Sequence, residues 1–431
     1  MSLEHRIKVV FCTIVSANYL SRAQVLKNSL KKYSPEYELK ILLCEKPEVC
    51  KEISKKAGHE FYSPADIGCR DWQHMAFYYT LIEYNTALKP FFLEQLCKEG
   101  YSSVIYFDPD IEVFSSLNEL VKLVLASDIV LTPHLCKPFI NDNKIPNMEG
   151  FIRGGQFNLG FLGITNSQDS LALLKWWQSV CTEKCIHDSE LRYFVDQFWA
   201  DIFPSFVEKA CILRYPGYNV AYWNIFQRDL KCLNGKWLID GKDLKFFHYS
   251  GLAKGDLSKV SIYQNRVTAP KGSDLYTILE MYFEKIKTQK WAEFNERPYS
   301  FSTYLNGEAI TVVERKKFLR LSKQERREFG DPFEKHTEIR SIIDINVAED
   351  NRKRTSSSNL RCIDTDSRII NQILDKIVDI DARMKVANPV SSTNIFGLYF
   401  EVWRKEGFLI TNLKMLRLIL RSIRGQAAGR P

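Results

Sequence analysis

The feature that most constrains the fold is the alternation of strand-like and helix-like segments between residue 7 and about residue 265. Short, β-branched apolar runs are followed by segments whose apolar residues recur at helical spacing. The expected strands are 9–15, 39–44, 104–107, 129–131 and 157–164. The expected helices are 21–33 (capped by Ser21), 71–97 (with a break at Lys89-Pro90), 117–125, 169–181 and 190–202. This alternation predicts an α/β fold in which helices cover both faces of a mostly parallel sheet.

One of these strands leads directly into two carboxylates. The apolar run 104–107 is followed by Asp108-Pro109-Asp110. Ligands of open α/β sheets bind at the carboxyl ends of the strands, so these aspartates are expected at a binding site. Two like charges this close repel each other unless a cation lies between them. Oxygen ligands favour Mg²⁺ or Mn²⁺, ions that often complete their coordination with substrate phosphates, and the motif therefore predicts an enzyme acting on a phosphorylated donor.

The same motif has two other interpretations. Asp-Pro-Asp also forms an ordinary turn after a strand, because Asp and Pro favour turn geometry. A phosphatase of the haloacid dehalogenase type opens with Asp-x-Asp as well, but it places the motif on its first strand and follows it with small residues. Here the motif lies far from the N-terminus and continues into Ile111-Glu112-Val113, which weakens the phosphatase interpretation.

Composition narrows the class of protein. The 431 residues are 45% hydrophobic and 26% charged, as in globular proteins. The net charge of +8 is modest and the basic residues are not interleaved with a stacking platform, so no nucleic-acid partner is expected. The eleven cysteines are predicted to be free thiols in a reducing cytoplasm. No apolar run is long enough to cross a bilayer, and 9–15 is interpreted as a strand rather than a signal sequence.

The character of the chain changes after residue 265. Residues 266–350 are expected to form a helical extension, with a helix at 275–291 and a highly charged segment at 314–328. Residues 351–364 are polar, basic and rich in serine, which predicts a flexible linker before C-terminal helices in 365–431. The last helix, 412–424, has one apolar and one basic face. A packed helix with a solvated basic face is the preferred interpretation; peripheral contact with the anionic inner-membrane surface is the alternative.

Eight short segments follow one another in an order typical of a single enzyme family. They are Phe11-Cys12-Thr13-Ile14, Asn85-Thr86-Ala87-Leu88-Lys89-Pro90, Tyr106-Phe107-Asp108-Pro109-Asp110-Ile111, Thr132-Pro133-His134, Phe157-Asn158-Leu159-Gly160-Phe161, Asp196-Gln197, the run Tyr215 to Asn224, and His248-Tyr249-Ser250-Gly251-Leu252-Ala253-Lys254. On these segments the chain resembles bacterial glycosyltransferases of the GT-A fold, similar to the retaining family 8 enzymes such as glycogenin and the lipopolysaccharide galactosyltransferases. It is still more similar to transferases of bacterial surface-polysaccharide clusters.

This resemblance implies a function for residues 1–265. They would move a sugar from a nucleotide-diphosphate donor, in the first place a UDP-sugar, to a glycan or a lipid-linked acceptor, with retention of configuration. The alternatives that stay open are an Asp-x-Asp phosphatase or nucleotidyltransferase, and a non-catalytic scaffold of a polysaccharide assembly complex.

The resemblance also implies roles for individual residues. Asp108, Asp110 and His248 match the metal ligands, and the imidazole favours Mn²⁺ over Mg²⁺. Asp196 and Gln197 match the residues nearest the anomeric carbon of the donor sugar. The matches to donor-binding positions are Thr13, Lys89, Asp108, Asn158, Gly251 and Lys254. The family continues with Pro-Trp after the lysine that Lys254 matches, whereas this chain has Gly255-Asp256.

Several of these residues also have ordinary structural interpretations. Lys89 could be a solvated lysine at a helix end. A helix cap or a buried, hydrogen-bonded polar group is the alternative for Thr13, Asn158, Asp196 and Gln197. A further set is assigned to the acceptor side because aromatic rings stack on sugar faces, with plain core packing as the alternative. This set is Asp71, Trp72, His134, Tyr218, Trp223 and Asn224.

Overall fold

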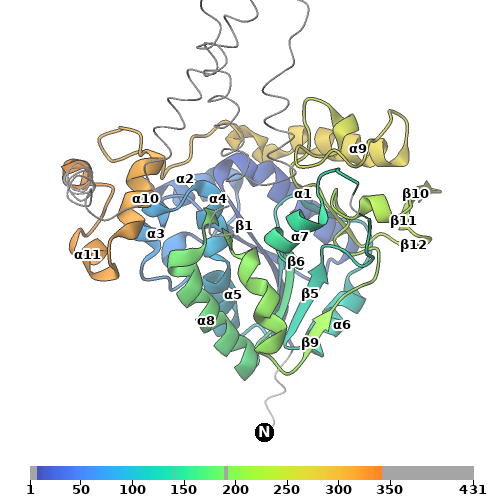
Figure 1. Cartoon of the computed structure of the whole chain (residues 1–431), viewed down its shortest axis with the longest axis horizontal. Helices are drawn as coiled ribbons and strands as arrows, with labels where there is room; N and C mark the ends of the chain where they lie inside the picture. The colour runs from blue at the N-terminus through green and yellow to red at the C-terminus, as the bar shows by residue number, and fades with distance from the viewer. Residues whose placement is uncertain (1–6, 141, 189–192, 342–431) are drawn as a thin grey trace, which may run out of the picture. The chain divides into compact units, whose positions relative to one another are not determined.

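The computed structural model describes residues 7–140, 142–188 and 193–341, and Figure 1 shows how their helices and strands are arranged. All of these residues belong to one unit, Met1–Ile345. The predicted linker 351–364, the C-terminal helices of 365–431 and the amphipathic helix 412–424 lie outside the described residues. The boundary at residue 265 stays a prediction.

A six-stranded sheet lies at the centre of the described unit. Its order is β2 (Leu39–Leu43), β1 (Val9–Val15), β3 (Ser103–Phe107), β6 (Phe157–Thr165), β5 (Ile129–Pro133) and β9 (Ala210–Ile212). β1 is parallel to β2 and β3, and β5 is parallel to β9, whereas β6 is antiparallel to both β3 and β5. The prediction of a mostly parallel sheet is confirmed, with β6 as the reversed strand.

The reversal of β6 has a local cause. The chain leaves β5 at the carboxyl edge of the sheet, forms the short helix α7 (Met148–Gly154) and enters β6 without a helix that crosses back to the other edge. An antiparallel neighbour needs no crossover, whereas a parallel one does. As a result, the first residues of β6 lie beside the last residues of β3, where Asp108 follows.

Helices cover both faces of the sheet, as predicted. Alternate residues of a strand point to opposite faces, and here Phe11 and Ile105 belong to one hydrophobic core while Val10 and Val104 belong to another. The first core includes α1 (Leu20–Tyr33), α2 (Pro47–Ala57) and α6 (Asn118–Leu125). The second includes α3 (Trp72–Tyr78), α4 (Leu81–Ala87), α5 (Lys89–Lys98) and α8 (Gln168–Lys184).

Two predicted helix starts differ from the structure. The cap of α1 is Tyr19 and not Ser21, whose hydroxyl donates to Asn295 Oδ1 at 3.0 Å instead. The predicted helix 71–97 is three helices. The break at Lys89-Pro90 is confirmed, because α5 begins there with a proline in its first turn, and a second break occurs at Thr80, which caps α4.

The predicted helix 190–202 is only partly present. Its described part contains β8 (Tyr193–Phe194), which pairs with β7 (His187–Asp188), and then η3 (Gln197–Ser205), a 3₁₀ segment. Pro204 lies inside η3 and cannot donate a backbone hydrogen bond, which disfavours a regular α-helix there.

A small sheet brings a distant part of the chain to the end of β3. β4 (Ile111–Val113), just after Asp110, pairs antiparallel with β13 (Phe246–His248). The strands β10 (Leu230–Leu233), β11 (Lys236–Ile239) and β12 (Lys242–Asp243) form a separate antiparallel sheet. β13 therefore returns next to the site-bearing turn although more than a hundred residues separate them in sequence.

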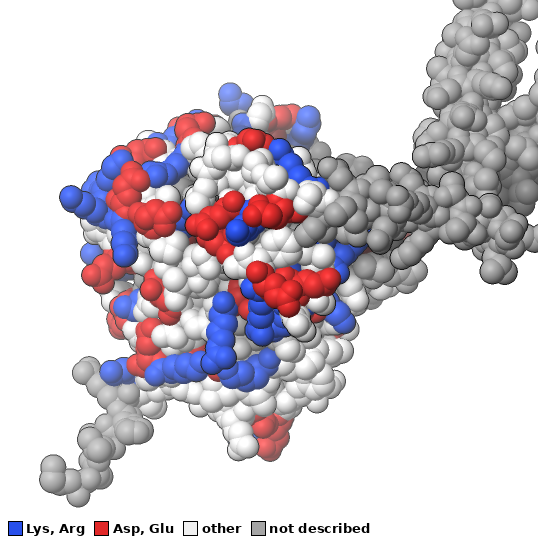
Figure 2. Space-filling view, turned by 90° about the vertical axis from the view of Figure 1, so that its left-hand side faces the viewer, with Lys and Arg blue, Asp and Glu red and all other residues white. Residues whose placement is uncertain are grey.

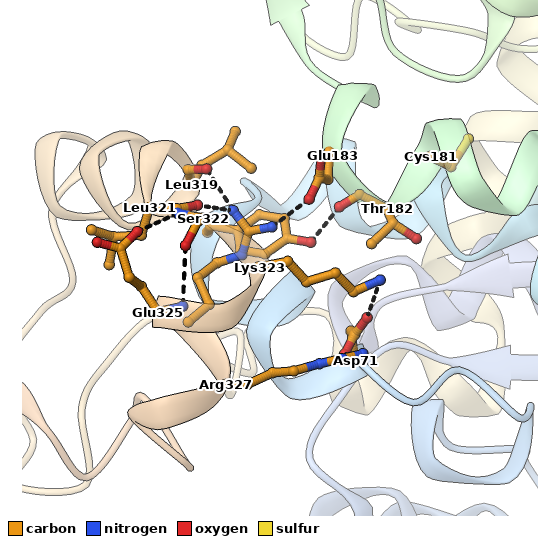
Figure 3. A network of polar contacts seen from close by, with 12 residues as sticks. Asp71, Cys181, Thr182, Glu183, Leu319, Leu321, Ser322, Lys323, Glu325 and Arg327 are labelled. Atoms are coloured by element: carbon orange, nitrogen blue, oxygen red, sulfur yellow. Dashed lines mark hydrogen bonds and ion pairs between the residues drawn. The ribbon is translucent and has the colours of Figure 1, made fainter.

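The described residues after 266 are mainly helical. They form α9 (Asp274–Thr288), the 3₁₀ segment η6 (Lys290–Phe294), α10 (Val312–Arg320) and α11 (Lys323–Glu328). α11 is held by Arg326, which contacts Glu183 of α8 at 2.6 Å, and by Lys323, which contacts Asp71 at 3.2 Å (Figure 3). On the face that carries this contact, basic and acidic side chains are interspersed (Figure 2). Within the described residues, no helix is both long and apolar enough to span a bilayer.

Candidate functional site

The structure brings together the three residues predicted as metal ligands. Asp108 and Asp110 lie in the turn between β3 and β4, and the pairing of His248 with Ile111 places the imidazole beside them. His248 Nε2 lies 3.1 Å from Asp110 Oδ1 and 3.6 Å from Asp108 Oδ2. One potential ligand atom from each residue falls within 4.8 Å of the others. Two carboxylates and an imidazole are a donor set that fits a divalent cation.

The charges of this cluster are strongly coupled. Burial by itself raises the pKa of Asp110, but the neighbouring His248 and Arg22 outweigh it, so the pKa lies below its usual value. Burial lowers the pKa of His248, and here Asp110 and Asp108 outweigh it and raise the pKa. The site thus favours the charged form of Asp110 and accepts positive charge, which is the electrostatic requirement for a cation site.

The His248 ring is fixed by its surroundings. The edge of Trp223 lies against it with ring centroids 5.1 Å apart at 90°. A Cβ at Gly160 would lie 2.3 Å from His248 Cε1, so only glycine fits at this position of β6. Asp108 is positioned in turn by Tyr106, whose hydroxyl donates to Oδ1 at 2.7 Å.

A buried ion pair lies beside the cluster. Lys89 is 2% exposed, and its Nζ lies 2.6 Å from Asp196 Oδ2 and donates to the Leu159 carbonyl at 2.9 Å. Burial lowers the pKa of Lys89, but Asp196 and Asp108 together raise it. Burial raises the pKa of Asp196 despite the attraction of Lys89. The interpretation of Lys89 as a solvated helix-end lysine is therefore wrong.

Gln197 and Asn158 form a second polar layer. The Gln197 Oε1 accepts from the Leu159 backbone at 3.0 Å and from Asn158 Nδ2 at 3.2 Å. The Asn158 Oδ1 accepts from the Gly160 backbone at 3.1 Å and from Asn219 Nδ2 at 3.0 Å. Both predicted site residues are thus buried amides that fix the start of β6. Asn158 holds the backbone of Gly160, which lies against the His248 ring.

The acceptor candidates separate into two groups. His134 and Trp223 lie close to the cluster, since Trp223 packs edge-on against both His134, at 5.4 Å, and His248. Asn224 and Tyr218 have structural uses. Asn224 holds a turn by donating to the Asn219 carbonyl at 2.9 Å, and Tyr218 is a 5% exposed core residue.

Asp71 contacts α11, and Trp72 packs in the core. The Asp71 carboxylate pairs with Lys323 at 3.2 Å and Arg327 at 3.4 Å (Figure 3), and these cations lower its pKa against the opposing effect of burial. Trp72 packs against Phe301 with centroids 6.2 Å apart. Both have a structural explanation, and their acceptor role stays a prediction.

The remaining donor candidates lie on β1 and in the loop after β13. Thr13 is fully buried and its hydroxyl has no hydrogen-bond partner among the described residues. Gly251 adopts φ +63°, and a Cβ there would lie 2.4 Å from the Tyr263 ring, so this turn requires glycine. Lys254 is exposed.

Four residues that contribute to the geometry of the site were not predicted as site residues. Gly160 and Tyr106 lie inside quoted motifs, so their spacing from Asn158 and Asp108 was an available signal. Asn219, which also donates to Thr132 Oγ1 at 2.8 Å, lies in a quoted motif too. Arg22 lies in the first turn of α1 and carries no sequence signal, because a helical arginine is usually solvated.

No family model matches this chain. The curated "Uncharacterized protein YfnD" of Bacillus subtilis (strain 168) is 24% identical over 253 residues, which are 56% of this chain and 77% of that protein. The glycosyltransferase GlyE of Streptococcus pneumoniae TIGR4 is similar with a TM-score of 0.40 and 16% identity, covering 69% of this chain and 67% of that one. The galactosyltransferase LgtC, solved with donor and acceptor sugar analogs, has a TM-score of 0.38 and 13% identity, covering 66% and 99%. With TM-scores this low, the assignment of an activity depends on the geometry of the site itself.

Proposed function

We propose that this protein is a metal-dependent glycosyltransferase that takes a sugar from a nucleotide-diphosphate donor. The observation that carries the proposal is the convergence of Asp108, Asp110 and His248 at the carboxyl edge of the sheet, next to the buried Lys89–Asp196 pair. A cation site beside a second, charge-neutral pair of residues suits a substrate with a diphosphate on one side and an uncharged sugar on the other.

The residues fit the chemical needs of glycosyl transfer. The sugar–diphosphate bond is already activated, so the protein mainly has to stabilise the departing negative charge, and a divalent ion held by Asp108, Asp110 and His248 supplies positive charge there. In this proposal Lys254 adds a second positive charge for the diphosphate. Asp196 faces the anomeric carbon as it becomes positively charged, with Lys89 holding the carboxylate in place, and Gln197 orients the adjoining backbone.

Further features of the proposal rest on the resemblance of the sequence motifs. They are a GT-A type of fold, a UDP-sugar donor, Mn²⁺ in preference to Mg²⁺, retention of configuration, and an acceptor that is a glycan or lipid-linked glycan of a bacterial surface polysaccharide. A cytoplasmic protein with peripheral membrane contact through 412–424 would suit a lipid-linked acceptor.

A nucleotide-sugar panel tests the proposal. The full chain is titrated with UDP-, GDP-, ADP- and CDP-sugars with and without Mn²⁺, and donor hydrolysis is followed in parallel. We expect manganese-dependent binding of at least one donor, and its loss in Asp110→Ala, which removes a ligand. The control Glu119→Gln removes an exposed carboxylate that pairs with Lys122 on α6 and should leave binding unchanged.

The two rival functions give different results in the same experiment. Release of phosphate from simple monoesters, abolished in Asp108→Asn, points to a phosphatase. No binding of any nucleotide or nucleotide-sugar by a folded chain contradicts the transferase proposal and leaves the scaffold role.

A further inference from the structure

Arg22 is a buried cation that forms no ion pair among the described residues. It is 5% exposed, and within the described part of the chain its guanidinium makes no hydrogen bond or ion pair. The guanidinium lies over the Tyr19 ring, whose centroid is 3.9 Å from the guanidinium carbon. A guanidinium has five N–H donors, and none of them is used by an acceptor of the described residues, which leaves them available to a ligand. Such an arrangement suits an anion that arrives with a ligand.

The position of Arg22 makes the metal cluster its neighbour. α1 starts at the carboxyl edge of the sheet, because it follows β1, which is parallel to β3. α1 then packs along β4, where the Val113 backbone donates to Ser29 Oγ at 3.1 Å. Arg22 therefore lies at the end of α1 that is near Asp110.

A second cation lies on the same side. Lys254 belongs to the loop after β13, and burial followed by the charge of Arg22 lowers its pKa against the opposing effect of Glu296. Within the described residues, no ion pair within 4.0 Å joins Lys254 to a carboxylate. Two neighbouring positive charges repel each other unless an anion lies between them, just as two neighbouring carboxylates repel each other unless a cation lies between them.

We propose that Arg22 binds the phosphate groups of the nucleoside diphosphate, opposite the metal cluster and together with Lys254. This inference rests on the proposed function and adds a donor-binding residue to it. The planar guanidinium offers a bidentate contact to phosphate oxygens that a lysine cannot make. Stacking on Tyr19 holds the plane of the guanidinium before the ligand binds, which reduces the entropy lost on binding.

The inference makes a distinctive electrostatic prediction. A buried positive charge next to Asp110 disfavours a bare metal ion but favours an anionic diphosphate. Removing this charge should therefore weaken nucleoside diphosphate binding and leave the affinity for Mn²⁺ alone unchanged or higher. An arginine that only stabilised the fold of the site would, on removal, weaken both.

Isothermal titration of the full chain with UDP, GDP, ADP and CDP in the presence of Mn²⁺, and with Mn²⁺ alone, tests this prediction. For Arg22→Gln we expect nucleoside diphosphate binding to be weaker by about 10- to 100-fold, the usual effect of losing a charge-assisted contact. Arg22→Lys keeps the charge but cannot make a bidentate contact, so its affinity for the nucleoside diphosphate should lie between those of the native chain and Arg22→Gln. The matched control is Lys31→Gln, which removes an exposed charge from the far end of the same helix.

The outcomes separate the two proposals. If the native chain binds no nucleoside diphosphate, the proposed function fails. A second outcome is that the native chain binds a nucleoside diphosphate and Asp110→Ala abolishes this binding, but Arg22→Gln binds as tightly as the native chain. That outcome overturns only the role of Arg22. A parallel loss of Mn²⁺ affinity in Arg22→Gln also overturns it. If Arg22→Gln does not fold, the same two titrations of Arg22→Lys, with nucleoside diphosphate and with Mn²⁺ alone, test the role of Arg22.

Discussion

At the scale of single residues, the metal cluster depends on the absence of a side chain at Gly160. His248 occupies the space that any Cβ at this position would need. We expect Gly160→Ala to displace the imidazole and to lower the affinity for Mn²⁺ by about 10- to 100-fold, as is typical when the support of a metal ligand is lost. Titration with Mn²⁺ measures the effect.

The matched control for this substitution is Gly255→Ala, because a Cβ at Gly255 meets nothing within 4 Å. This variant should bind Mn²⁺ like the native chain. Equal affinity of Gly160→Ala and Gly255→Ala would show that His248 does not take part in metal binding.

His134 should make the stability of the protein depend on pH. Burial lowers its pKa to about 4 from the ordinary value of 6.5. Its neutral ring fits its surroundings, with Nδ1 bonded to the Gly155 carbonyl at 2.8 Å and Nε2 facing Asn158 Nδ2 at 3.4 Å. The unfolded chain takes up a proton on this residue below about pH 6.5, whereas the folded chain does so only near pH 4. Protonation of His134 therefore does not reduce the free energy of unfolding above about pH 6.5. Its contribution falls by about 3 kcal/mol as the pH drops to 4.

Urea unfolding at pH 7, 5.5 and 4.5 measures this contribution. His134→Gln is expected to be less stable at pH 7 but to lose less stability on acidification than the native chain. An identical pH dependence of the two proteins would show that His134 takes up its proton at the same pH in the folded and in the unfolded chain.

At the scale of elements, the Lys89–Asp196 pair joins α5 to the start of η3. Breaking a buried pair leaves one uncompensated charge, so Lys89→Met should lower the free energy of unfolding by about 3–5 kcal/mol. Lys89→Met combined with Asp196→Asn should cost less than the two single changes added together. A double-mutant cycle by urea unfolding measures the coupling, and additive effects would mean that the two side chains do not interact in solution.

The sequence predicts the existence of elements better than their boundaries. β1, α6 and β5 come out nearly as expected, because each has a clear apolar pattern within itself. The errors occur in segments whose conformation depends on contacts with distant parts of the chain. Ser21 bonds to Asn295 instead of capping α1, and the segment around Gln197 follows the hydrogen bonds it makes to β6 rather than helical periodicity.

At the scale of the whole described unit, the helical extension shares a core with the sheet. Phe301, Phe318 and Phe333 are buried in the same hydrophobic cluster as α3 and α5. The buried Arg315 donates to the Ala76 and Tyr79 carbonyls at 3.0 Å each, which ties α10 to the end of α3. Residues 1–265 alone would thus expose part of the core on one face of the sheet.

We therefore expect a chain ending at residue 265 to lack a cooperative unfolding transition, whereas a chain ending at residue 345 should unfold cooperatively. Circular dichroism during heating and binding of a hydrophobic dye compare the two. Cooperative unfolding of residues 1–265, with nucleotide binding retained, would contradict this expectation and make the extension a separate domain.

The sequence alone determined the α/β class and the aspartates at the end of β3, because local patterns of apolar residues and a two-carboxylate motif carry that information within a few neighbouring positions. The match of His248 to a metal ligand came from a resemblance, and only the pairing of β13 with β4 brought it within 3.1 Å of Asp110. The antiparallel direction of β6, the burial of Lys89 against Asp196 and the unpaired Arg22 were decided by the tertiary structure. Each of them depends on contacts between segments that are far apart in the chain, and the free energy of burying a charge exists only once those segments have packed.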